Sequence, residues 1–149
     1  MIPRGILLVE DNVQDELLTL RSLRKVNLVN EVDVVRDGQQ ALDYLFREGE
    51  FAGRPGESLP AVVLLDLGLP RVGGLDVLAR LRADARTRLL PIVILTSSDE
   101  EQDRLRSYLR GANSFVRKPV DFAEFAETVA QLGVYWMAIN EPPSREAQP

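Results

Sequence analysis

The sequence contains neither cysteine nor histidine among its 149 residues. Without cysteine the chain has no disulfide bond, no thiol nucleophile and no zinc–thiolate site. Without histidine it has no imidazole base, no imidazole metal ligand and no carrier for a phosphohistidine, so a partner must supply any such group. Long apolar runs are also missing, because segment 1–11 has four consecutive apolar residues and then two acids. That segment predicts neither a secretion signal nor a membrane span, and we expect a cytoplasmic protein.

Basic residues are in the minority, with 18 Lys and Arg against 23 Asp and Glu and a net charge of -5. Nucleic-acid binding needs a basic face that neutralises phosphates, so we expect no nucleic-acid partner. A chain of 149 residues, 45% hydrophobic and 28% charged, predicts one globular domain with a substantial core. We expect this domain to span residues 1–140 and to be followed by a polar, disordered tail at 141–149.

Short aliphatic runs alternate with helical patterns five times along the chain. The expected strands lie in segments 5–11, 31–35, 61–66, 91–95 and 113–119. The expected helices lie in segments 13–23, 39–46, 75–81, 101–110 and 122–139. Strict alternation predicts an α/β domain with a doubly wound parallel sheet, because a parallel crossover needs a helix and packs with one hand.

Helix boundaries are marked by capping residues. Asn12 and Asp121 are the expected N-caps of the first and last helices. Ser98 and Glu101 have the spacing of a capping box before the fourth helix, and Gly111 is its expected stop. Apolar residues recur at helical steps at Val13, Leu17, Leu20 and Leu23, and Phe122, Phe125, Val129 and Leu132 are expected on the inner face of the last helix. An Asp37-Gly38 turn closes the second strand.

Polar side chains follow four of the expected strands. Glu10 and Asp11 come after the first strand, Asp66 after the third, Thr96 after the fourth and Lys118 after the fifth. Each alone has an ordinary explanation, such as an acid at a helix N-terminus or a solvated lysine. In an open parallel sheet, however, the carboxyl ends of the strands meet at one edge, where ligands bind. Their convergence favours a functional site.

This chain resembles the receiver domain of response regulators, the CheY-like family of two-component signalling. The residues that carry the likeness are Glu10-Asp11, Asp66 within DLGLP, Gly74, Thr96-Ser97, Phe115 and Lys118-Pro119. The likeness covers about residues 5–133 and implies a five-stranded sheet of order 2-1-3-4-5 with an extended C-terminal helix. Departures are the replacement of one common aspartate by Glu10, Leu69 where methionine is frequent, and a longer loop between Phe46 and Pro60.

The resemblance implies that Asp66 accepts a phosphoryl group and that the protein is a phosphoacceptor, not a turnover enzyme. Carboxylates about 5 Å apart repel one another by roughly 3 kcal/mol at an effective dielectric near 20, so the site needs a cation. Mg²⁺ fits because it takes oxygen ligands and keeps several waters. The family implies that Asp11, Asp66 and the backbone carbonyl of Gly68 bind Mg²⁺, with Glu10 acting through a water. Lys118 would neutralise phosphoryl oxygens.

A conformational switch is also implied by the resemblance. Thr96 would hydrogen-bond the phosphoryl group and vacate space that Phe115 fills, although a static core phenylalanine is equally consistent with the sequence. The Lys118-Pro119 bond is expected to be cis. Gly68 and Ser98 occupy positions that shape water access to the phosphoryl group in this family.

Signal output is expected through protein contacts, because only about ten residues follow the receiver-like part. A sensor histidine kinase would donate the phosphoryl group. The apolar C-terminal stretch and the fourth helix predict a homodimer through the fourth helix, fifth strand and fifth helix, built on Leu105, Tyr108, Tyr135, Trp136 and Ile139. The alternative is that Trp136 folds back on its own domain. The long loop together with LGVYWMAINEPP is similar to single-domain receivers that partner bacterial phytochrome kinases.

Two other functions fit the sequence less well, and a third stays open. A haloacid-dehalogenase phosphatase needs a second aspartate two residues after the nucleophile, where this chain has Gly68. A flavodoxin-like FMN carrier is disfavoured because Glu10 and Asp11 stand where a phosphate needs donors. A degenerate receiver that binds partners without phosphorylation stays open.

Overall fold

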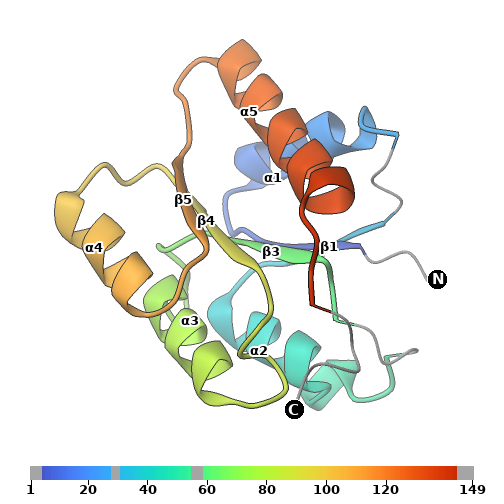
Figure 1. Ribbon diagram of the computed structural model, residues 1–149, viewed down its shortest axis with the longest axis vertical. Coiled ribbons are helices and arrows are strands. Elements are labelled where there is room, and N and C mark those ends of the chain that lie inside the picture. Colours follow the sequence, from blue (N-terminus) through green and yellow to red (C-terminus); the bar gives the residue numbers. More distant parts are fainter. Residues whose placement is uncertain (1–4, 28–30, 55–58, 144–149) are drawn as a thin grey trace.

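A five-stranded parallel sheet forms the centre of the molecule in the computed structural model, which describes residues 5–27, 31–54 and 59–143. Its strands are β1 (Ile6–Val9), β2 (Val32–Val35), β3 (Val62–Leu65), β4 (Ile92–Thr96) and β5 (Ser114–Arg117), in the order β2-β1-β3-β4-β5 (Figure 1). Both the predicted strand content and the predicted order are confirmed. The register aligns the carboxyl ends: Val9 lies opposite Val35 and Leu65, and Leu65 lies opposite Ile94.

Helices cover both faces of this sheet (Figure 1). Their bounds are α1 (Val13–Arg24), α2 (Gly38–Phe46), α3 (Gly74–Ala83), α4 (Glu101–Leu109) and α5 (Phe122–Val134). Figure 1 shows α1 and α5 on one face, α2 and α3 on the other, and α4 beside β5. A short 3-10 turn, Gly49–Phe51, follows α2. No helix in the described segments is long and apolar enough to cross a membrane.

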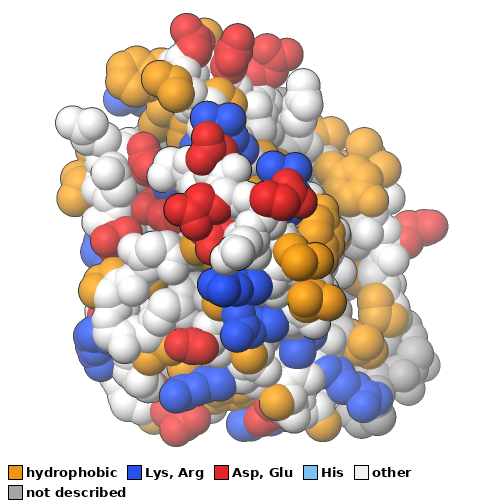
Figure 2. Space-filling view, turned by 90° about the vertical axis from the view of Figure 1, so that its left-hand side faces the viewer, with side chains coloured by type: hydrophobic (Ala, Val, Ile, Leu, Met, Phe, Trp, Pro, Cys, Tyr) orange, Lys and Arg blue, Asp and Glu red, His pale blue; other side chains and the backbone are white. Residues whose placement is uncertain are grey.

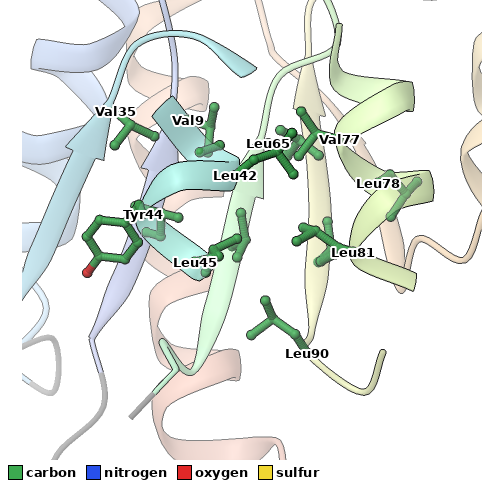
Figure 3. Close-up of a cluster of buried hydrophobic side chains, with 14 of the residues drawn as sticks. Val9, Val35, Leu42, Tyr44, Leu45, Leu65, Val77, Leu78, Leu81 and Leu90 are labelled. Carbon is green, nitrogen blue, oxygen red and sulfur yellow. The ribbon is translucent and has the colours of Figure 1, made fainter. Parts of the chain in front are cut away.

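The larger apolar core lies between the sheet and the α2 and α3 helices (Figure 3). Val77, Leu78 and Leu81 of α3 are fully buried there. From α2, Leu42 and Leu45 pack into the same cluster. These helices therefore place their apolar stripes against the sheet, as the sequence periodicity predicts.

The α1–α5 core, between the sheet and the α1 and α5 helices, is smaller. Unlike α3, α1 does not bury its whole apolar stripe there. Asn12 caps the helix as predicted, because its side chain accepts a hydrogen bond from the Asp15 N–H. The apolar stripe, however, does not coincide with the buried face: Val13 is 64% exposed and Leu17 is 56% exposed, whereas Leu23 is buried. The buried face also contains Glu16, Thr19 and Ser22. Periodicity defines a stripe but does not say on which side of the helix the sheet lies.

The last helix begins at the predicted cap, with the Asp121 carboxylate accepting from the Glu124 N–H at 3.0 Å. Phe125 and Val129 are buried as predicted. Phe122 is 75% exposed, so its placement on the inner face was wrong. It belongs to the first turn, before the helix reaches the core. A π-helical turn, Tyr135–Ile139, extends α5 to the predicted end of the C-terminal helix.

The predicted capping box before α4 was wrong. The N-cap is Glu100, and its side chain makes no capping bond. Ser98 instead donates to a carboxylate oxygen of Asp103 at 2.7 Å and accepts from the Glu100 N–H at 3.3 Å, so it lies two residues before the N-cap and does not form the predicted box with Glu101. The predicted stop is confirmed at Gly111, where φ is 98°. Most of the expected polar tail, residues 144–149, lies outside the described residues.

Candidate functional site: an acidic pocket around Lys118

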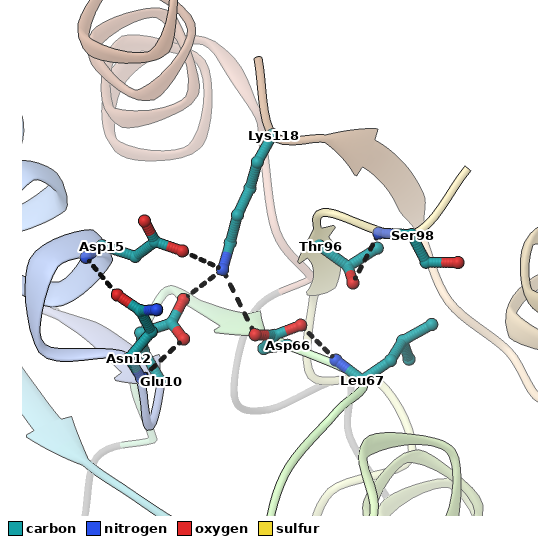
Figure 4. Close-up of polar contacts among 8 residues, drawn as sticks. All are labelled: Glu10, Asn12, Asp15, Asp66, Leu67, Thr96, Ser98 and Lys118. Carbon is teal, nitrogen blue, oxygen red and sulfur yellow. Dashed lines mark hydrogen bonds and ion pairs between the residues drawn. The ribbon is translucent and has the colours of Figure 1, made fainter. Parts of the chain in front are cut away.

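Lys118 lies at the centre of the charged residues that follow the strands (Figure 4). Its Nζ is 2.5 Å from a carboxylate oxygen of Glu10, 2.9 Å from Asp15 and 3.2 Å from Asp66. The Lys118 backbone N–H donates to the Thr96 carbonyl at 2.7 Å, which aligns the end of β5 with the end of β4. Four chain segments are therefore joined through one ammonium group.

The peptide bond between Lys118 and Pro119 is trans, because the described residues contain no cis peptide bond. The prediction of a cis bond was wrong. From a trans backbone just after β5, the long Lys118 side chain still reaches Glu10, which follows β1 two strands beyond β4.

Glu10 is a buried carboxyl group, 1% exposed. Burial raises its pKa to about 7, against the lowering effect of Lys118, and the charge of Asp66 adds to the rise. The Asn12 N–H also donates to Glu10 at 3.1 Å. For Lys118, burial alone lowers the pKa, but the hydrogen bonds to Glu10 and Asp15 and the charge of Asp66 outweigh burial and raise it. Lys118 is therefore a fixed positive charge.

Asp15 is a member of this cluster that the sequence analysis missed. It lies in the first turn of α1, where an acid is ordinarily explained by the helix dipole. In the structure its carboxylate faces Lys118 across the site. The feature of the sequence that could have identified Asp15 is its position one helical turn after Asp11, which puts both acids at the same end of α1.

Glu10, Asp11 and Asp66 can form a cation site. One carboxylate oxygen from each lies within 4.8 Å of the others. Glu10 is buried, Asp66 is half-buried and Asp11 is exposed, so the group opens to solvent on one side. An all-oxygen donor set of this kind fits a hard divalent cation such as Mg²⁺. Three carboxylates contact the Lys118 ammonium and Asp11 adds a fourth beside them, so the site carries excess negative charge, which is the second reason that it fits a cation.

An open cavity of about 960 Å³ lies over Asp66. Asp11, Gly68, Thr96 and Lys118 all line it, so the strand ends meet as their positions in the sequence predict. The Thr96 hydroxyl oxygen accepts from the Ser98 N–H at 3.3 Å. One Asp66 oxygen accepts from the Leu67 N–H at 2.7 Å, which fixes the orientation of the carboxylate.

Apart from Thr96, the residues predicted as a switch and an interface do not line this cavity. Phe115 is half-buried on β5 and packs against the α2–α3 core. Leu105 and Tyr108 on α4, and Tyr135 and Ile139 after α5, are exposed. Trp136, by contrast, is half-buried and packs against the α1–α5 core, which is the alternative that the sequence left open. Tyr135 and Trp136 form an edge-to-face pair with ring centroids 5.0 Å apart.

Comparisons with known proteins agree with this fold and site. The response regulator receiver domain matches residues 6–130. A probable methanogenesis regulatory protein, FilR2 of Methanothrix harundinacea, is 41% identical over 141 residues, which cover 95% of this chain and 88% of FilR2. Response regulator Rcp1 of Synechocystis is 32% identical over 135 residues, or 91% of this chain and 90% of Rcp1.

Solved structures show the same likeness in three dimensions. The Mn²⁺-bound form of Rcp1 covers 95% of this chain and 100% of its own, with a TM-score of 0.88 and 31% identity. The bacteriophytochrome response regulator RtBRR is 53% identical, with a TM-score of 0.76, over 95% of this chain and 85% of its own. The chain therefore belongs to the response regulator receiver family of two-component signalling.

Proposed function

We propose that this receiver domain accepts a phosphoryl group on Asp66 from the phosphohistidine of a sensor histidine kinase in a Mg²⁺-dependent reaction, and acts as a phosphoacceptor in the cytoplasm, not as a turnover enzyme. The observation that carries the proposal is the position of Asp66. Its carboxylate faces an open cavity beside Glu10 and Asp11 and lies 3.2 Å from the Lys118 ammonium. A nucleophile, a candidate cation site and a fixed positive charge therefore meet at one point.

The transfer step needs little from the protein beyond position and charge. An Asp66 oxygen forms a bond to phosphorus while the phosphorus–nitrogen bond of the phosphohistidine breaks, and the electron pair leaves with the imidazole of the kinase. Asp11, Asp66 and the carbonyl of Gly68 would hold Mg²⁺, with Glu10 acting through a water. When bound, Mg²⁺ neutralises charge on the phosphoryl oxygens. Lys118 neutralises the remaining negative charge on the phosphoryl oxygens.

Thr96 and Phe115 are the residues that we propose report phosphorylation. Thr96 lines the cavity and is 3% exposed, so its hydroxyl can donate to a phosphoryl oxygen bound in the cavity. Movement of Thr96 would open space toward β5. Thr96 pairs with Arg117 of β5, and Phe115 lies two residues before Arg117 on the same strand. Phe115 is only half-buried, so a move into the space left by Thr96 would bury more of its ring.

The kinase partner is supported by exposed apolar residues near the phosphoacceptor. Val13 and Leu17 are exposed on α1, which begins just after Asp11. Val120 and Phe122 are exposed just after Lys118 and are 92% and 75% accessible. Large apolar side chains left in solvent mark protein interfaces. We propose that this surface docks a kinase of the bacterial phytochrome class, which the name and likeness of the bacteriophytochrome response regulator RtBRR support.

We also propose a homodimer through α4, β5 and α5. Leu105, Tyr108, Tyr135 and Ile139 are its exposed apolar residues, with Trp136 supporting Tyr135 from beneath. Figure 2 shows one side of the molecule, with acidic side chains mostly in its upper part and Lys and Arg mostly below. Sedimentation of a dimer at micromolar concentration is expected, and a monomer at that concentration contradicts this interface.

The phosphoacceptor proposal is tested with a small phosphodonor and Mg²⁺. The chain is expected to gain about 80 Da by mass spectrometry, the increment of one phosphoryl group. Asp66→Asn removes the nucleophile and is expected to abolish the gain. No gain with the unchanged protein contradicts the proposal and favours a degenerate receiver that binds partners without phosphorylation.

A further inference from the structure

The loop that follows Asp66 packs directly on the start of α2. The Gly38 N–H donates to the Pro70 carbonyl at 3.2 Å. A Cβ atom at Gly38 would lie 1.8 Å from the carbonyl oxygen of Val72, so no side chain fits there. The Asp37-Gly38 pair, which the sequence marks only as a turn, is therefore a contact surface for the 67–73 loop.

Asp37 joins the two segments through its side chain. One carboxylate oxygen accepts from the Gln40 N–H at 2.7 Å and caps α2. The other accepts from the Arg71 guanidinium at 3.3 Å. The Asp37 carboxylate is 12% exposed, so both oxygens take protein donors in place of most of their water.

Arg71 adopts a backbone conformation that a residue with a Cβ atom avoids. Its φ is 69°, in the left-handed region. A glycine here would be free of this strain, yet the chain carries an arginine whose guanidinium reaches Asp37. The contact with Asp37 offsets the strain, which indicates that the Arg71 side chain has a structural role at this position.

The other end of the loop is held by α3. The Gly74 N–H donates to the Leu67 carbonyl at 3.0 Å, and a Cβ atom at Gly74 would lie 2.2 Å from the Asp66 carbonyl oxygen. Between these two attachments lies Gly68, which lines the cavity and whose side-chain direction is empty. The position of Gly68 therefore depends on what holds each end of the loop.

We infer that Asp37 and Arg71 are positioning residues for the cation site: they fix the 67–73 loop on α2 so that the Gly68 carbonyl is available to the cation. The inference rests on the proposed function, in which Gly68 is a ligand. Neither residue touches the cation. They act through the backbone of the loop, as partners that orient metal ligands do elsewhere.

A neighbouring ion pair provides a matched control. Arg36 is 2.9 Å from Glu16, and the side-chain exposures are 59% and 10%, against 60% and 12% for Arg71 and Asp37. The Arg36 pair links the β2–α2 connection to α1, and in the described structure neither Arg36 nor Glu16 forms a hydrogen bond or ion pair with the 67–73 loop. Loss of either pair removes a similar interaction, but only one pair is attached to the loop.

The test measures Mn²⁺ binding to the full chain by the electron paramagnetic resonance signal of free Mn²⁺. Asp37→Asn keeps a capping side chain and removes the charge. This variant and Arg71→Gln are expected to raise the dissociation constant about tenfold. Arg71→Lys is expected to recover much of the affinity because it keeps the charge. Arg36→Gln is expected to stay within about twofold of the unchanged protein.

Two further readouts separate positioning from stability. Arg71→Gly removes the guanidinium and relieves the positive φ, so its unfolding midpoint is expected not to fall while its Mn²⁺ affinity drops as in Arg71→Gln. Backbone amides of residues 67–73 are expected to exchange faster in Asp37→Asn than in Arg36→Gln, both without metal.

The outcomes distinguish this inference from the proposed function. If the unchanged protein binds no Mn²⁺, the cation site itself is wrong and the inference falls with it. If the unchanged protein binds Mn²⁺ but Asp37→Asn and Arg71→Gln bind it equally well, the inference alone is overturned. An equal loss in Arg36→Gln also overturns it, because the effect would not depend on the loop.

Discussion

The two faces of the sheet differ in how strictly their helices follow the amphipathic pattern. On one face, Val77, Leu78 and Leu81 of α3 are all fully buried. On the other, α1 turns Glu16 inward and leaves Leu17 in solvent. Burial of a leucine side chain contributes about 2 kcal/mol, so α1 forgoes stability that α3 gains. In the proposed function, the apolar residues that α1 leaves exposed form part of the kinase-docking surface.

In the proposed function, this division separates stability from signalling. The α2–α3 face supplies the larger core, whereas α1 carries Asp15, which contacts Lys118, together with the exposed Val13 and Leu17. Substitutions on the first face should therefore change the free energy of unfolding, and substitutions at the start of α1 should change phosphorylation.

The largest effect on stability is expected for Leu81→Ala in α3. Leu81 is fully buried in the α2–α3 core, and truncation leaves a cavity there. The free energy of unfolding is expected to fall by about 3 kcal/mol, measured by urea denaturation. Phosphorylation by a small donor should be unchanged below the transition. A loss under 1 kcal/mol, about the effect of an ordinary surface change, would contradict the assignment of stability to this face.

Asp11→Asn is expected to stabilise the protein while weakening cation binding. Asp11 shares the acidic group with Glu10 and Asp66, and removal of its charge relieves repulsion. Because Asp11 is exposed, the gain is expected to be only about 1 kcal/mol. Mn²⁺ affinity should fall at least about tenfold. Glu127→Gln, an exposed acid on α5, is the control and should change neither quantity.

Tyr44→Phe tests a polar contact at the edge of the α2 side. The Tyr44 hydroxyl donates to Asp33, and burial, together with this bond and the Asp33 charge, raises the Tyr44 pKa. A raised folded-state pKa stabilises the protein below the unfolded value of about 10 and loses this effect as the pH rises further. At pH 7 the variant should lose about 1 kcal/mol, and the difference should shrink above pH 10. A difference that does not change with pH contradicts this account.

The smallest effect on stability is expected for Leu17→Ala. This side chain is 56% exposed, so the free energy of unfolding should change by less than about 0.5 kcal/mol. Phosphotransfer from the partner kinase should slow about tenfold if Leu17 docks the kinase, while the rate with a small phosphodonor stays the same. Leu89→Ala, an exposed leucine in the α3–β4 connection, should leave both rates unchanged. Equal kinase rates for the two variants would remove Leu17 from the docking surface.

Much of the site could be predicted because it follows the strands. Glu10 and Asp66 come directly after aliphatic runs and Lys118 comes directly after the fifth strand, so strand order alone brings them to one edge. Asp15 and the Asp37–Arg71 pair could not be found this way. Both depend on where loops and helix starts meet in space, and their residue types are equally common in ordinary caps and turns.

The sequence by itself determined the strands, the alternation with helices and the gathering of polar groups at the strand ends, because each depends on local hydrophobic pattern and on the geometry of parallel sheets. Only the tertiary structure decided which side of α1 is buried, that Phe122 stays in solvent while Trp136 packs inward, and that the 67–73 loop is attached to α2. Those outcomes depend on contacts between segments far apart in the chain, and no local pattern encodes the partner of a side chain.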